Sequence, residues 1–323
     1  MKKQTFFKTL LFFLLGIVFT AHPAFGQFNT MTGSVSYQNI PQSDFEGTGA
    51  WQFVGSANTI NYPNAPSGNK VLFLRGQGTA YQSIVVSQAG CFRFDIQAAQ
   101  ASTAGNNSFS IYIKGQEVVE VTPNSTAFNT VHSVAFTLDP GIYVLELKGL
   151  LSTPYAVLLD DIQLARLPCW SDASNWSLDS VPGPTDTAFV AMDKLVVLND
   201  SAHCHSIRVM GKFLAANNVD LKLDANMFMV MQQNGLLEWG QAHTPYENKG
   251  VFTLHGNIGL AQAGMQTAAL MVMDKAKLQL HGKPRDSWTQ LGAHANQGTN
   301  QITLKEPMDW KVGDLIVIAS TDF

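Results

Sequence analysis

Charged residues are scarce in this chain of 323 residues, where Asp, Glu, Lys and Arg together make up 14%. A typical soluble domain carries about a quarter of such residues. The formal net charge is only -4, and no cluster of basic side chains interrupts the sequence. Nucleic-acid binding needs a basic surface to meet the phosphates, so we expect no nucleic-acid partner.

Cysteine is also rare, with Cys91, Cys169 and Cys204 the three in the sequence. So few cysteines exclude a small scaffold held together by disulfides. An exported chain can still form one bond, and Cys169 with Cys204 is a candidate pair. The alternative interpretation is that these cysteines are buried thiols.

Long apolar runs are absent after residue 26, and no later segment has helical periodicity. The N-terminus combines three lysines with the apolar run Leu10–Phe19 and small residues at Ala24 and Gly26. This pattern predicts a signal peptide over residues 1–26, cleaved before Gln27. A retained membrane anchor is the alternative, but the run is short for a spanning helix. We therefore expect a secreted or cell-surface protein with no transmembrane segment in the mature chain.

Residues 44–166 contain short alternating runs bounded by glycine, proline or asparagine. Strands spaced about ten residues apart with such turns predict an antiparallel sandwich. The glycines of Asp139–Gly141 and Lys114–Gln116 permit the positive φ that hairpin turns need. The predicted fold class is therefore all-β. The expected strands are 70–75, 82–86, 91–96, 109–114, 117–121, 132–138 and 142–148.

Residues 170–323 repeat a different pattern, in which each strand-like run is followed or preceded by a single glycine. Glycine fits tight corners where a Cβ atom would collide with the backbone. The pattern predicts a coiled stack of strands whose inward apolar side chains lie over one another. The apolar run Met227–Met231 is expected in that core. The glycines in question are Gly211, Gly235, Gly240, Gly256 and Gly282.

The first strand-rich segment opens with Asp44, Phe45 and Glu46, followed by Trp51, and closes with the run Leu159–Leu164. These features resemble the carbohydrate-binding jelly-roll superfamily. The resemblance implies a jelly-roll sandwich over residues 44–166, in which the opening and closing strands lie side by side. Residues 27–43 precede it as an N-terminal extension.

In that superfamily a structural calcium ion often lies where those two strands meet. The resemblance implies that Glu46 and Asp161 are ligands of Ca2+, with Asp44 or Asp160 as lesser candidates. Carboxylate oxygens suit this hard cation. The alternative is that these acids are solvated strand ends.

The second half is similar to the G-eight domain, which is named for its glycines. That family includes hyaluronan-associated cell-migration proteins, the fibrocystin group and bacterial exported relatives. The resemblance implies a right-handed parallel β-helix over residues 170–323 that continues in a longer chain. It rests on these elements in this order: Trp170, Asp172, Asn175 and Trp176; Val181–Pro184; Gly235–Gly240; Pro245 and Tyr246; Leu254–Gly256; Trp288–Leu291; and Asp309–Ser320.

Two histidines, His203 and His205, would share one face of a strand and could bind one metal ion. A third ligand would have to come from His255, His281 or His294 through folding. Because the sequence does not fix that geometry, we interpret the pair as polar residues that lead into a strand.

No catalytic residue is assigned. Asp309 and Asp314 flank Trp310, but the resemblance to the G-eight domain implies a structural turn before a strand here, and not the paired carboxylates of a glycosidase.

Carbohydrate recognition needs exposed aromatic rings with polar neighbours. Trp51, Tyr62 and Tyr81 lie near expected loops or strand edges and are the candidate carbohydrate-binding residues. A role in the core or at its rim is the alternative for each. Trp239, Trp288 and Trp310 are expected to fill coil corners, with sugar stacking as their alternative.

The favoured function is a glycan-binding or adhesion protein whose β-helix is a rigid scaffold. Its expected partner is a polysaccharide or glycoconjugate. Two alternatives remain open: the first part of an extracellular polysaccharide hydrolase or lyase acting on a hyaluronan-like substrate, and a purely structural surface protein.

Overall fold

The computed structural model describes residues 27–47, 49–255 and 268–319. The expected signal peptide, residues 1–26, lies outside these ranges. The prediction of an all-β fold is confirmed, because the described ranges contain strands and one turn of 3-10 helix, η1 (Ala173–Asn175), but no α-helix. No helix in these ranges has the length and apolarity needed to cross a membrane.

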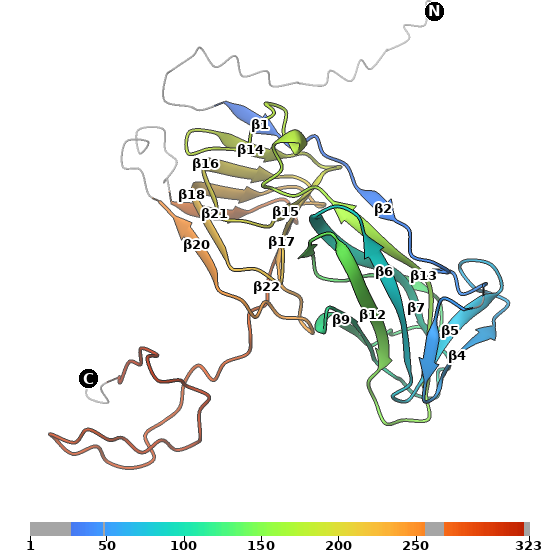
Figure 1. Ribbon diagram of the computed structural model, residues 1–323. Coiled ribbons are helices and arrows are strands. Elements are labelled where there is room, and N and C mark those ends of the chain that lie inside the picture. The colour runs from blue at the N-terminus through green and yellow to red at the C-terminus, as the bar shows by residue number, and fades with distance from the viewer. Residues whose placement is uncertain (1–26, 48, 256–267, 320–323) are drawn as a thin grey trace, which may run out of the picture.

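Two antiparallel sheets make up the first unit, which we call the sandwich (Figure 1). One sheet has seven strands in the order β10-β7-β13-β5-β4, with β11 also paired to β7 and β2 to β13. Its strands are β2 (Ser36–Gln38), β4 (Ala57–Asn61), β5 (Lys70–Arg75), β7 (Gly90–Gln100), β10 (Asn129–His132), β11 (Phe136–Leu138) and β13 (Ala156–Leu167). The other has the order β3-β6-β12-β8-β9. Its strands are β3 (Gln52–Val54), β6 (Thr79–Val86), β8 (Phe109–Ile113), β9 (Gln116–Val121) and β12 (Gly141–Gly149).

The sandwich core lies between these sheets because side chains alternate along each strand. In β6 the even-numbered residues from Ala80 to Val86 are buried, whereas the odd-numbered ones point outward. Phe94 and Phe136 meet in this core with ring centroids 5.7 Å apart. Burying one such side chain is worth about 1.5–3 kcal/mol. This alternation leaves the outer face of each sheet available for polar and aromatic residues.

Two parallel sheets make up the second unit, which we call the coil stack (Figure 1). The chain passes from a strand of the six-stranded sheet to one of the four-stranded sheet and back, so neighbouring strands in each sheet are parallel. The six-stranded sheet contains β1 (Phe28–Thr30), β14 (Thr187–Val190), β16 (Ala202–Val209), β18 (Leu221–Val230), β20 (Gly250–Leu254) and β21 (Ala269–Val272). The four-stranded sheet contains β15 (Leu195–Leu198), β17 (Lys212–Ala215), β19 (Leu236–Trp239) and β22 (Lys277–Leu280).

Two of the expected corner glycines lie where the chain turns between these sheets. A Cβ atom at Gly211 would overlap the carbonyl oxygens of Lys194 and Ala191. One at Gly235 would overlap the carbonyl oxygen of Met231. At both corners neighbouring backbone fills the space that any other side chain would need.

The run Met227–Met231 is only partly in the core. Phe228 and Val230 are fully buried between the two parallel sheets, whereas Met227 and Met229 are half-buried on the opposite face. A period of two residues in a strand sends neighbouring side chains to opposite faces, so a continuous apolar run cannot all point inward.

The outer face of the seven-stranded sheet packs against the four-stranded parallel sheet. Cys91 and Leu167 from the sandwich form one apolar cluster with Val197 and Leu214 from the coil stack. Backbone and side-chain hydrogen bonds add to this junction: Thr137 N donates to Asn218 Oδ1 at 2.8 Å, and Asn218 Nδ2 donates back to Thr137 O at 2.9 Å.

A disulfide joins Cys91, in β7, to Cys169, which follows β13, with their Cα atoms 5.6 Å apart. The candidate pair Cys169 and Cys204 is therefore wrong. Cys204 is a buried free thiol in β16. Sequence spacing could not identify the partner because β7 and β13 become neighbours only when the sandwich folds.

The segment after the expected leader belongs to both units. Residues Phe28–Thr30 form β1 and pair in parallel with β14, whereas Ser36–Gln38 form β2 and pair with β13. Met31, between them, is buried in the core of the coil stack.

Residues 283–319 extend away from the coil stack, with an isolated bridge between Leu291 and Leu304 (Figure 1). The strand expected near Leu315 is not formed in the described part of this segment, where Leu315 and Val317 are 101% and 95% exposed. A strand needs a partner for its backbone groups, and the described residues place none beside this run.

Candidate functional site

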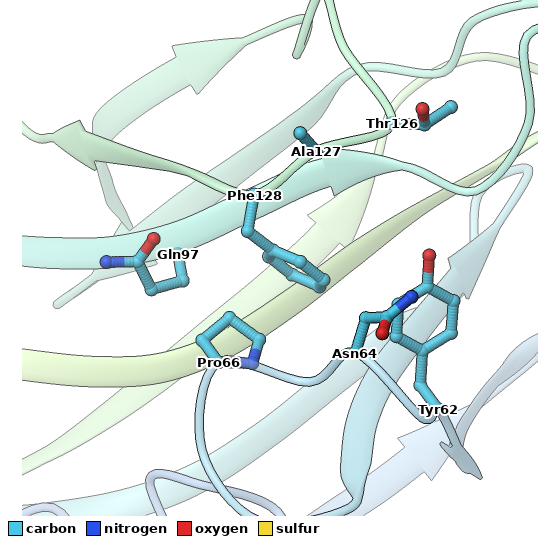
Figure 2. A pocket seen from close by; sticks show the side chains of 7 residues that line it. All are labelled: Tyr62, Asn64, Pro66, Gln97, Thr126, Ala127 and Phe128. Carbon is cyan, nitrogen blue, oxygen red and sulfur yellow. The ribbon is translucent and has the colours of Figure 1, made fainter.

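A hollow on the outer face of the seven-stranded sheet contains two aromatic rings (Figure 2). Its volume is about 650 Å³. Tyr62, from the loop after β4, and Phe128, from the loop before β10, meet edge to face with ring centroids 6.0 Å apart. The lining residues are Tyr62, Asn64, Pro66, Gln97, Thr126, Ala127 and Phe128.

Local hydrogen bonds hold both loops over the sheet. Tyr62 N donates to Asn69 O at 2.8 Å, and Tyr62 O accepts from Ala65 N at 3.1 Å, which closes a turn. In the other loop, Ser125 Oγ accepts from Ala127 N at 2.9 Å, as such side chains do in turns. Both rings are therefore carried by loops with defined conformations.

Apolar residues support the rings from below. Val71, Ala99 and Leu158 are fully buried and form a small cluster against which Tyr62 and Phe128 pack. These three face outward from the sandwich, so they give the sheet a second apolar layer beneath the hollow. The rings themselves are only half-buried.

Amide groups lie beside the rings. Gln97, from β7, and Asn64, from the Tyr62 loop, line the same hollow, and Gln97 Nε2 donates to Thr130 Oγ1 at 2.9 Å. Aromatic rings with a few fixed polar groups are the lining that binds sugars, since pyranose faces are apolar and their hydroxyl groups need partners.

Tyr81 lies on the opposite side of the sandwich, on the outer face of the five-stranded sheet. It lines a second hollow of about 470 Å³ together with Pro41, Ala50, Gln52, Gln82, Ser83 and Val144. Residues directly opposite each other in the strand register form a polar row across this face. The row runs Gln52, Tyr81, Glu146, Tyr112 and Glu117.

Tyr112, in that row, is half-buried, and burial together with the negative charge of Glu117 raises the pKa of its hydroxyl. The hydroxyl therefore stays protonated and can act as a hydrogen-bond donor at neutral pH. The predicted residues Tyr62 and Tyr81 lie in two separate hollows, on opposite faces of the sandwich.

Trp51 is part of the sandwich core and is only 7% exposed. Its ring packs on Phe45 with centroids 5.1 Å apart, and its Nε1 donates to Gln42 O at 2.9 Å. Neither face of this ring is presented to solvent, so its surroundings favour the core alternative over sugar stacking.

Glu46 and Asp160 meet the same loop, residues 67–70. Glu46 Oε1 accepts from Asn69 N and Lys70 N at 2.5 Å each, and Asp160 Oδ2 accepts from Ser67 N at 2.8 Å. Asp161 follows at a bulge with a positive φ of 44° and accepts from Gln163 Nε2.

Asp160 is fully buried, and its burial raises the pKa of its carboxyl to about 6, helped by the charges of Asp161 and Asp44. The acidic residues predicted as calcium ligands thus lie together at one corner of the sandwich. Among the described residues, no three His, Cys, Asp or Glu side chains form a closed ligand set.

The other candidates are dispersed. His203 and His205 lie on the outer face of the six-stranded sheet. Asp309 lies in the exposed segment 283–319, where its Oδ1 accepts from Asp286 N at 3.1 Å. Asp314 accepts from Lys311 N at 2.8 Å within a turn, in keeping with the structural interpretation.

Phe128, Asn64 and Gln97 were not among the residues predicted for sugar binding. Phe128 lies in a loop that follows Thr122 and Pro123. A single aromatic residue in a loop does not by itself indicate a sugar-binding site. Its partner Tyr62 is distant in sequence, so folding alone shows that they form one site.

Comparison with known proteins identifies part of the chain. Residues 175–292 match the family model of the G8 domain. Among similar proteins, human Fibrocystin-L is 28% identical over 165 residues, which is 50% of this chain, and the mouse protein is 29% identical over 178 residues, which is 52%. The chain covers 4% of the length of each relative.

Two solved structures resemble part of the chain at low similarity. A carbohydrate-binding module in complex with β-1,4-galactotriose gives a TM-score of 0.33 at 16% identity, covering 39% of this chain and 97% of that chain. A family 35 carbohydrate-binding module from Clostridium thermocellum gives 0.32 at 13% identity, covering 41% and 98%.

The G8 match begins within η1 and extends through the strands of the coil stack to β22 and beyond. Residues 175–292 of the chain therefore carry a G8 domain, as the resemblance of the second half to that domain implies.

Proposed function

We propose that this protein binds neutral glycans through its sandwich, at the hollow formed by Tyr62 and Phe128. The observation that carries the proposal is the meeting of two half-exposed aromatic rings from separate loops, with the amides of Asn64 and Gln97 beside them. A sugar ring can lie against the aromatic surface while its hydroxyl groups bond to the amides.

The hollow suits a ligand of low charge. Its seven lining residues include no Asp, Glu, Lys, Arg or His. An acidic sugar would find no cation among them to replace the water around its carboxylate. Neutral oligosaccharides are therefore the expected ligand class.

A glycan array probed with the mature chain tests this proposal. Tyr62→Ala and Phe128→Ala are each expected to weaken binding about tenfold or more, since a lost aromatic contact is worth roughly 1.5 kcal/mol or more. Tyr37→Ala is the matched control, because Tyr37 is an exposed tyrosine of the same sheet that lies outside the hollow.

Two results would reject the proposal. One is a folded wild-type chain that binds no polysaccharide. The other is binding that Tyr62→Ala and Phe128→Ala leave at wild-type strength. Tyr81→Ala, on the opposite face, shows whether the second hollow contributes.

The coil stack is proposed as a right-handed parallel β-helix that carries this binding unit outside the cell or at its surface. The alternation of the chain between two parallel sheets supports the β-helix, and the Cys91–Cys169 disulfide supports an oxidising location. The alternation and the apolar junction support the proposal that the two units form a rigid scaffold.

A structural Ca2+ ion is proposed at the corner that contains Glu46 and Asp161, with Asp44 and Asp160 beside them. The corner fits a hard cation because several carboxylates gather there and one of them, Asp160, is fully buried. Lys70 also lies at this corner, but its Nζ donates to the main-chain oxygen of Glu46, at 3.1 Å.

Thermal unfolding tests the calcium proposal. The unfolding midpoint is expected to be a few degrees higher in millimolar Ca2+ than in the presence of a chelator. The reason is that an ion that binds only the folded state stabilises it. Asp161→Asn is expected to abolish the difference. An unchanged midpoint in the wild type would remove Glu46 and Asp161 as ligands.

A further inference from the structure

Three neighbouring strands of the coil stack bring two histidines and an aspartate together on one outer face. β18 lies between β16 and β20 in the six-stranded sheet (Figure 1). His203 of β16 is directly opposite Asp224 of β18. His255 follows β20, and its N donates to Ala225 O at 2.8 Å, which places it beside the same stretch of β18.

The side chains of these residues converge. The imidazole rings of His203 and His255 have centroids 6.1 Å apart. His255 Nε2 lies 3.6 Å from Asp224 Oδ1. The other carboxylate oxygen, Oδ2, forms an ion pair with Lys222 Nζ at 2.6 Å.

Asp224 Oδ1 is a buried oxygen without a hydrogen-bond partner in the described part of the chain, and the residue is only 9% exposed. An unpaired buried carboxylate oxygen costs free energy, so such atoms almost always have a donor or a cation nearby. The Asp224 carboxylate also interacts with the hydroxyl of Thr253, its register neighbour in β20. The imidazole of His255 lies beside Oδ1 itself, at a distance too long for a good hydrogen bond.

We propose that His203, Asp224 and His255 bind a transition-metal dication, with Zn2+ as the representative ion. Imidazole nitrogen and carboxylate oxygen are ligands that zinc prefers. Two ligands at about 2.0 Å from a tetrahedral ion are about 3.3 Å apart, close to the separation of His255 Nε2 and Asp224 Oδ1. Calcium is disfavoured, because it takes six or more oxygen ligands.

Small side-chain rotations complete the site. As the side chains stand, no group of three or more His, Cys, Asp or Glu in the described residues could hold a metal ion. The His203 side chain is exposed, and that of His255 is 51% exposed, so both rings can turn toward Asp224 Oδ1 without repacking the core. Lys222 can keep its bond to Oδ2 throughout.

The bound ion would connect the first strands of three successive coils. His203 belongs to β16, Asp224 to β18, and His255 follows β20. Among the described residues, β20 has no further strand beside it in the order of its sheet. A metal ion across these strands would fix this edge of the G8 domain, a role independent of glycan binding.

Titration of the untagged mature chain with ZnCl2 and CoCl2 at pH 7.5 tests the site. We expect one equivalent of Zn2+ to bind with micromolar affinity, and Co2+ to give the visible absorption of a tetrahedral site. His203→Ala and His255→Ala are each expected to weaken binding tenfold or more, as is Asp224→Asn.

His205→Ala is the matched control. His205 lies two residues from His203 in the same strand, but its Nδ1 faces Asn226 Nδ2 at 3.0 Å. This variant should bind Zn2+ like the wild type. Absence of stoichiometric binding would overturn the proposal, and so would affinity that His203→Ala and His255→Ala leave unchanged. Both replaced histidines are exposed, so the variants are expected to fold, which circular dichroism checks.

Discussion

Glu238 and Asp95 are two carboxylates at the junction of the sandwich and the coil stack, and their surroundings move their pKa values in opposite directions. Burial raises the pKa of Glu238, although Gln241 donates a hydrogen bond to it. Burial also pushes the pKa of Asp95 upward, but hydrogen bonds from His132 and Arg93, each at 2.7 Å, outweigh it and lower that pKa. The two acids therefore respond differently to pH.

Replacing Glu238 by Gln is expected to stabilise the protein at pH 7 and to have little effect near pH 4. The raised pKa means that the ionised form is disfavoured in the folded state, so this group costs stability above its folded pKa. Below the usual value of 4.5 it is protonated in both states, and the cost disappears. We expect the midpoint to rise by about 1–3 °C at pH 7.

Thermal unfolding of wild type and Glu238→Gln across pH 4 to 7 is the measurement. The difference between the unfolding midpoints of the two proteins should increase as the pH rises. Asp95→Asn is the opposing comparison: it should destabilise most at neutral pH, where the ionised Asp95 is paired, and least below pH 3. A gap for Glu238→Gln that narrows with rising pH would contradict the account.

Cys204 shows why a cysteine count alone could not assign the disulfide. Burial raises the pKa of its thiol to about 12, so almost no thiolate forms near neutral pH. Thiolate is the form that exchanges with disulfides. Cys204 is therefore an inert residue in the core of the coil stack, in a different apolar cluster from the bonded pair.

At the scale of elements, the disulfide ties the start of β7 to the segment that leaves β13 for the coil stack. Cys91 and Cys169 are separated by 78 residues. Cys169 also forms an isolated β-bridge with Val197 of β15. The disulfide therefore lies where the chain passes from the sandwich to the coil stack. Closing a loop of this size restricts the unfolded chain, and such bonds typically stabilise by roughly 2–4 kcal/mol.

The double variant Cys91→Ala with Cys169→Ala is expected to unfold about 5–10 °C lower than wild type. Cys204→Ala serves as the control, since it removes a cysteine without breaking the bond. Reductant should lower the midpoint of the wild type and leave that of the double variant unchanged. Equal midpoints for the wild type and the double variant would show that the bond does not hold the junction.

Strand positions were largely predictable from the sequence, because alternation is a local property. The predicted run 70–75 coincides with β5, and the run 142–148 lies within β12. The run 132–138 was predicted as one strand but is divided into β10 and β11 around Ser133, whose N donates to Phe94 O and whose Oγ accepts from Phe94 N. When a side chain such as that of Ser133 replaces a main-chain group in the pairing, the strand is interrupted. The alternation of apolar and polar residues in the sequence does not show this.

Contacts between distant segments were not predictable in the same way. Tyr62 was predicted as a sugar-binding residue, whereas its partner Phe128 was not. His255 was one of three histidines considered as a further ligand beside His203, and the parallel register selects it. In both cases the missing information is which strands are neighbours, and single-sequence periodicity does not contain it.

At the scale of the whole molecule, the N-terminal segment, one apolar cluster and a disulfide join the two units. The N-terminal segment supplies β1 to the coil stack and β2 to the sandwich. The junction covers one end of the outer face of the seven-stranded sheet, and the Tyr62 hollow lies over Val71, Ala99 and Leu158 on that same face. The junction and the proposed binding site therefore share one face of the sandwich.

Methyl NMR on the mature chain, with labelled alanine and valine methyl groups, tests glycan binding at this hollow most directly. Ala127 lines the Tyr62 hollow (Figure 2). Val144 lines the hollow on the opposite face. The account predicts that the glycan bound most strongly on the array shifts the Ala127 signal and leaves Val144 in place. A shift of Val144 with Ala127 unmoved, or no shift of either at saturation, would contradict it.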